Sequence, residues 1–191
     1  MSNLEERLRR DLEPILEMAD PRPRISAYHD MPYAIFPYKP SDEFQLRTQL
    51  TMLEIRLSQK GKQVHSISLA ECLDEAMRSQ NTLEDWFAVE REQGVATIVE
   101  TVHAVLSEYS PLVDHVAGRM PAHPDPLCDI VFIVRAGALF PMYRTFSLPE
   151  QLKGQVHVPT VLFYPGEVEG AGGLKFMGVL DAEHNYRSKI I

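Results

Sequence analysis

The chain has few cysteines and little positive charge, and each shortage excludes a class of protein. Its two cysteines, Cys72 and Cys128, form no C-x-x-C pair, so neither a disulfide framework nor a zinc ribbon is predicted. The net charge of −8 argues against contacts with a phosphate backbone, so we expect no direct nucleic-acid binding. No apolar run reaches the roughly 20 residues that span a bilayer. The charged start MSNLEERLRR is no signal segment, so we expect a cytoplasmic protein with no membrane contact.

The usual motifs of catalysis and ligand binding are also missing. The seven histidines form no H-E-x-x-H or H-x₃₋₅-H pair, and no G-x-S-x-G elbow is present. Asp181, Glu183 and His184 could hold a cation, but such clusters more often face water in a turn. The GAGG stretch at 170–173 lacks a dinucleotide fingerprint and is more typical of a hairpin tip. The sequence therefore predicts no catalytic residue, no cofactor and no metal.

What the chain does have is a set of apolar strands. The run DIVFIVRAG at 129–137 has no internal turn former, which is typical of a central strand buried on both faces. A loop and short helix over 138–153 lead to a second such run, PTVLFYPG at 159–166. Strand, helix and strand in this order predict a parallel crossover unit.

The first half of the chain extends the same pattern. A short strand is expected at 33–36, a helix with leucines at 46, 50, 53 and 57 follows, and QVHSISL at 63–69 predicts the next strand. Residues 70–118 read as a helical insertion before the central strand. We therefore predict one α/β domain over 1–191, with a mainly parallel sheet in three layers and helices on both faces.

The segment FPYKPSDEF joins the first strand to its helix, where a nucleotide-binding protein carries its phosphate loop. Lys39 and Ser41 are present, but the segment has two prolines and no glycine, and glycines are what let backbone amides approach phosphates. The sequence therefore allows a degenerate P-loop-like topology, in which the order of strand, loop and helix is kept but the glycines that bind phosphate are missing.

The end of the chain is rich in aromatic side chains and turn formers. Tyr164, Pro165 and Gly166 follow a strand, and Tyr186 and Arg187 lie close to the C-terminus. Tyrosine and arginine are common anchors of protein contacts, so these five residues are candidates for partner binding. The alternative is that the tyrosines complete the sheet and Pro165-Gly166 makes a turn.

Four stretches of the C-terminal third, IVRAGALFPMYR, PTVLFYPG, LKFMG and NYR, resemble the BrxB family. The similarity is close from about residue 129 to the end. It implies a component of the BREX bacteriophage-exclusion systems that acts with a DNA methyltransferase, a large ATPase and the phosphatase-like PglZ protein. The family has no established catalytic residues, so the resemblance implies none for this chain.

These observations favour a non-catalytic adaptor over an enzyme. PglZ is the partner we favour, because a small acidic chain without chemistry of its own suits docking to a larger protein. The methyltransferase and the large ATPase are further candidates. One alternative is a degenerate NTP-binding or NTP-hydrolysing domain of the same system, and another is a nucleic-acid binder, whose affinity would fall steeply with salt.

Overall fold

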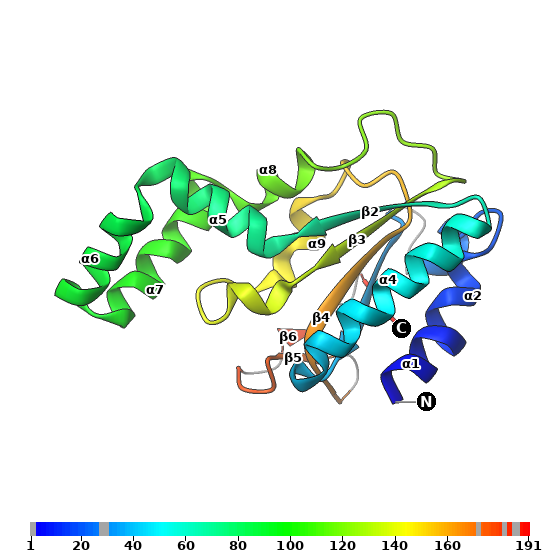
Figure 1. The fold of residues 1–191 in the computed structure, drawn as a ribbon, viewed down its shortest axis with the longest axis horizontal. Coiled ribbons are helices and arrows are strands. Elements are labelled where there is room, and N and C mark those ends of the chain that lie inside the picture. Colours follow the sequence, from blue (N-terminus) through cyan, green and yellow to red (C-terminus); the bar gives the residue numbers. More distant parts are fainter. Residues whose placement is uncertain (1–2, 27–30, 171–172, 181–182, 185–187) are drawn as a thin grey trace.

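The computed structural model describes residues 3–26, 31–170, 173–180, 183–184 and 188–191. Within them, five strands form a parallel sheet in the order β2-β3-β4-β1-β7 (Figure 1). Their bounds are β1 (Tyr33–Tyr38), β2 (Gln63–Ser68), β3 (Asp129–Val134), β4 (Thr160–Glu169) and β7 (Lys189–Ile190). The predicted strands and the parallel sheet are thus confirmed.

The central strands explain the unbroken apolar runs of the sequence. β4 lies between β1 and β3, so that Thr160 is paired with both Tyr33 and Val131. All six residues of β1 and the first seven of β4 are buried. A strand that is covered on both faces exposes neither face to water, so apolar and polar residues do not alternate along these segments.

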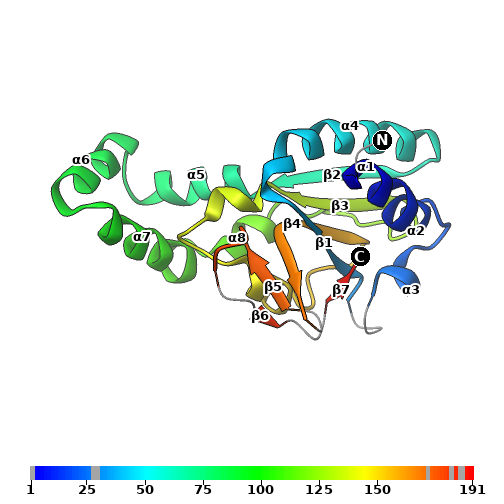
Figure 2. The same cartoon turned by 90° about the horizontal axis from the view of Figure 1, so that it is seen from below.

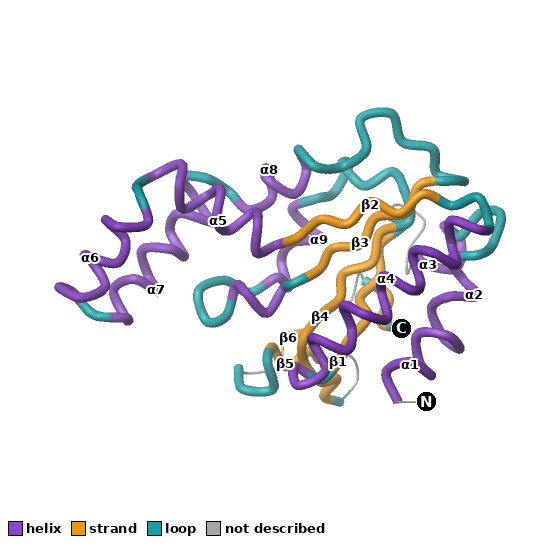
Figure 3. Tube along the Cα trace, in the orientation of Figure 1, coloured by secondary structure: helices purple, strands orange, loops and turns teal. Residues whose placement is uncertain are grey.

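Helices cover both faces of the sheet, as the three-layer prediction requires (Figures 2 and 3). One face carries α1 (Asn3–Arg7), a π-helical turn η1 (Leu8–Leu12), α2 (Glu13–Leu16), α3 (Arg22–Ile25) and α4 (Glu43–Gln59). The other face carries α5 (Leu69–Gln80), the π-helical turn η3 (Val105–Tyr109), α8 (Leu112–Ala117), the 3₁₀ turn η4 (Ala136–Leu139) and α9 (Leu148–Gln151).

Aromatic side chains hold the α4 layer to the sheet. The ring of Phe163 lies between those of Phe36 and Phe132, with centroids 5.8 Å and 5.1 Å away. The predicted leucines of α4, at 46, 50, 53 and 57, are all buried against this cluster. The heptad-like spacing of these leucines therefore correctly predicted the inner face of the helix.

The predicted helical insertion is present, and part of it leaves the body of the protein. Helices α6 (Leu83–Gln93) and α7 (Val95–Ala104) form a hairpin that stands away from the sheet in both views (Figures 1 and 2). Its base is fixed by Trp86, which is buried and whose indole Nε1 donates to the carbonyl of Met77 at 3.1 Å. Gly94, with φ of 86°, makes the sharp turn at its tip.

Past its parallel part, β4 bends into a hairpin with β5 (Gly173–Phe176), which continues to β6 (Glu183–His184). The pairing of Glu169 with Gly173 confirms the hairpin that was predicted at this point of the chain. Gly166 is required by this hairpin, because a Cβ there would lie 2.3 Å from the carbonyl oxygen of Lys175.

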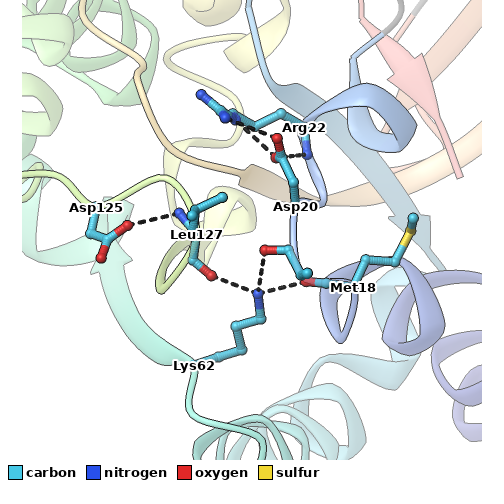
Figure 4. A network of polar contacts seen from close by, with 7 residues as sticks. Met18, Asp20, Arg22, Lys62, Asp125 and Leu127 are labelled. Atoms are coloured by element: carbon cyan, nitrogen blue, oxygen red, sulfur yellow. Dashed lines mark hydrogen bonds and ion pairs between the residues drawn. The ribbon is translucent and has the colours of Figure 1, made fainter.

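At the amino edge of the sheet, one buried lysine joins three segments. Lys62 precedes β2, and its ammonium donates to the carbonyls of Met18 at 2.6 Å, Ala19 at 3.3 Å and Leu127 at 2.6 Å (Figure 4). Asp125 supports the same loop by accepting from the amide of Leu127. Lys62 therefore ties the end of the N-terminal helices to the entries of β2 and β3.

Candidate functional site

The carboxyl edge of the sheet contains a cavity of about 210 Å³. After β1, the 3₁₀ turn η2 (Pro40–Asp42) leads into α4 on one face, whereas η4 follows β3 onto the other face. β4 lies between these two strands. In open parallel sheets, ligands usually bind in a crevice outside the carboxyl ends of the strands. The cavity is lined by Pro40, Glu43, Arg47, Arg135, Gly137, Ala138, Pro165 and Met177.

A second cavity, of about 140 Å³, adjoins the first beneath α4. Glu43, Arg47 and Arg135 line both cavities. Leu50 of α4 and Val134 at the end of β3 contribute apolar wall to the second one. We call the two together the carboxyl-edge crevice.

Glu43 organises the α4 side of this crevice. Its carboxylate accepts a hydrogen bond from the hydroxyl of Tyr38 and another from Arg47 Nε at 2.9 Å. Burial, and then the hydrogen bond to Glu43, raise the pKa of Tyr38 above its ordinary value, so the phenol keeps its proton and remains a donor. The guanidinium of Arg47 also lies 5.0 Å from the ring centre of Phe44, which is 77% exposed.

Arg135 stands at the opposite wall in an unusual backbone conformation. Its φ of 61° and ψ of 34° are left-handed, a region that side chains other than glycine and asparagine rarely adopt. Its side chain is exposed and forms no hydrogen bond or ion pair with any residue in the described ranges. Arg135 was not among the candidate residues predicted from the sequence, although an arginine directly after a buried strand was a signal for a functional side chain.

The residues predicted as partner anchors fall in different surroundings. Tyr164 is only 1% exposed, and its ring packs 5.3 Å from that of Phe176. This position favours the alternative interpretation, in which Tyr164 completes the sheet, because a buried ring presents no surface to a partner. Pro165 lines the crevice, and Gly166 is buried and paired with Phe176 of β5. Both residues lie inside β4, so the predicted turn at Pro165-Gly166 is wrong. Tyr186 and Arg187 lie outside the described residues.

Metal ligands were not expected, and among the residues whose placement is described no three His, Cys, Asp or Glu side chains gather around a common point. The side chains of the Asp181, Glu183 and His184 cluster lie outside the described structure. None of the helices described is long and apolar enough to cross a membrane.

A second candidate surface is the segment 69–109, which we call the helical arm and which contains α5, α6 and α7. It holds nine carboxylates and two arginines, a formal charge of −7 out of −8 for the whole chain. In the described residues, only Asp74 and Glu75 of these nine form ion pairs. The arm also exposes large apolar side chains, with Phe87 54%, Val95 63% and Tyr109 68% accessible.

Comparison with known families identifies the chain. The family model described as BREX protein BrxB matches residues 65–191, from β2 to the C-terminus. The chain belongs to the BrxB family. It is thus a component of the BREX phage-exclusion system, and the resemblance seen in the C-terminal third is confirmed over a longer stretch that includes the helical arm. Neither the curated proteins nor the solved structures contain a match.

Proposed function

We propose that this BrxB-family protein is a non-catalytic adaptor that binds a larger BREX component through its helical arm. The observation that supports this role is the α6–α7 hairpin of the arm, which stands away from the sheet and exposes apolar side chains among carboxylates (Figure 1). Aromatic and aliphatic anchors surrounded by charge are the usual composition of a transient protein interface.

The charge of the arm selects the kind of partner. Two arms facing each other would repel, so a second copy of this chain is a poor occupant. We infer that the arm meets a basic surface with an apolar centre on another protein.

PglZ is the partner we favour, on the ground that a small acidic protein suits docking to a larger one. The DNA methyltransferase and the large ATPase of the system are the other candidates. Co-purification of the tagged chain with each of the three proteins separately distinguishes among them, and adaptor function predicts a stable complex with at least one.

Substitution in the arm then tests the surface. Phe87→Ser, and separately the double change Glu90→Lys with Glu92→Lys, should weaken the complex by about tenfold or more, because interface anchors typically contribute more than about 1.4 kcal/mol. Phe44→Ser is the matched control, since Phe44 is an exposed phenylalanine on α4 at 77% accessibility. Failure of all three BREX proteins to bind the wild-type chain would refute the adaptor role.

The alternative function, a degenerate NTP-binding or NTP-hydrolysing domain of the same system, is favoured by one observation. β1 lies inside the parallel sheet, next to β4, and leads through the short turn η2 into α4, an order that agrees with a P-loop-like topology. The connecting loop contains no glycine, and Ser41 donates to its neighbour Asp42. Release of phosphate from ATP by the purified chain, abolished by a point change at the crevice, would establish this alternative instead.

A further inference from the structure

The carboxyl-edge crevice has no part in the adaptor role, yet it has the features of a ligand site. Its two cavities, of about 210 Å³ and 140 Å³, share three lining residues and lie where the connections after β1 and β3 part. Their combined volume lies at the lower end of the roughly 300–1,000 Å³ that small-molecule sites occupy. The crevice therefore has room for a compact ligand and not for a folded partner.

The crevice is lined by two carboxylates, Glu43 and Glu54, and by two arginines, of which one is unpaired in the described structure. Glu43 is engaged by Arg47 and by the hydroxyl of Tyr38. Glu54 lines the second cavity but not the first, and its carboxylate accepts from the hydroxyl of Ser66 at 2.7 Å. Arg135 has no partner of this kind among the described residues, so its positive charge is available to a ligand in a protein of net charge −8.

Two residues that line the crevice have a strained backbone conformation. In the described chain, two residues other than glycine have a positive φ, Arg135 at 61° and Met177 at 55°. Both line the first cavity, where the amide of Met177 donates to the carbonyl of Pro165 at 2.8 Å. Such strained residues gather at binding sites, where the surrounding fold holds a side chain in a set direction.

We propose that the carboxyl-edge crevice binds a small anionic ligand, a phosphate ester or a carboxylate, through the guanidinium of Arg135 with Arg47 on the facing wall. The planar guanidinium donates two parallel hydrogen bonds to either kind of anion. Pro40, Pro165 and Met177 provide the apolar wall against which the uncharged part of the ligand packs.

Calorimetric titration of the full chain with four probes tests this site: inorganic phosphate, AMP, ATP and citrate. Saturable binding of the phosphate probes or of citrate identifies the source of the anion, and either result supports the site. Arg135→Gly should weaken that binding about ten- to hundredfold, the range expected for loss of one charged hydrogen-bonding group. Glycine adopts a positive φ without strain, so this variant should keep its thermal midpoint, and a loss of binding cannot be ascribed to unfolding.

Arg91→Ala is the matched control, because Arg91 is an exposed arginine on α6 far from the crevice, and its binding should equal that of the wild type. Absence of saturable binding of all four probes at millimolar concentration would overturn the proposal. So would binding that Arg135→Gly leaves unchanged.

Discussion

Replacement of Lys62 by methionine is expected to destabilise the fold strongly, although Lys62 lies far from both candidate surfaces. Methionine fills a similar volume but offers no donor to the carbonyls of Met18, Ala19 and Leu127 (Figure 4). The two contacts at 2.6 Å are short charge-assisted hydrogen bonds, and the one at 3.3 Å is weaker. Lys62 is 8% exposed, so little water can replace it.

The expected loss follows from these three contacts. Each hydrogen bond to a charged group contributes about 1.5–3 kcal/mol, so the two short ones give about 3–6 kcal/mol. Part of this loss is offset, because folding of the methionine variant does not have to remove an ammonium group from water. We expect a net loss of about 2–4 kcal/mol in the free energy of unfolding, which for a domain of this size lowers the melting midpoint by about 4–16 °C.

Urea unfolding followed by circular dichroism measures this difference. Lys60→Met is the control, because Lys60 lies two residues earlier with an exposed side chain, and its replacement should change the free energy by less than about 0.5 kcal/mol. If Lys62→Met lost less than about 1 kcal/mol, the three carbonyls would not depend on the ammonium and the reasoning would be refuted.

Three further predictions concern stability. Gly166→Ala should cost about 2 kcal/mol or more in a thermal melt, because its Cβ would lie 2.3 Å from the carbonyl oxygen of Lys175, whereas Gly137→Ala, whose Cβ meets nothing nearer than 3.5 Å, should cost less. Arg135→Gly should leave the free energy of unfolding unchanged or raise it by up to about 1 kcal/mol, because it relieves a left-handed backbone; a clear loss in urea unfolding would contradict this. The raised pKa of Tyr38 means that above about pH 10 the unfolded chain loses a proton that the native chain keeps, so stability should fall as pH rises, and Tyr38→Phe should show a smaller fall between about pH 8 and pH 11.

The sequence predicted the body of the fold because its signals there are local. The run that became β3 and the run Thr160–Tyr164 that begins β4 contain no turn former and are flanked by prolines and glycines, which is typical of buried strands. The leucines of α4 specified their inner face by spacing alone. The insertion between β2 and β3 followed from its length, since two parallel neighbours require a crossover.

The sites were harder to predict, because they depend on contacts between distant segments. Tyr164 follows a strand in the same way whether its ring is buried or exposed, and only the return of β5, with Phe176, decides that it is buried. The direction of the Arg135 side chain depends on a left-handed backbone conformation, and no residue next to Arg135 in the sequence predicts that conformation. Arg135 and Arg47 line the same cavities because β1 and β3 are both parallel to β4, so that the carboxyl ends of the two strands lie at one edge of the sheet.

The concentration of negative charge in the helical arm also makes the charge distribution of the whole molecule strongly uneven. With −7 in residues 69–109 and −1 in all the rest, the protein is a strong electric dipole whose negative pole is the arm. In the field of a positively charged body it would rotate before it touches, so that the hairpin arrives first. Encounter rates should therefore rise as ionic strength is lowered, while the neutral body carrying the crevice remains turned outward.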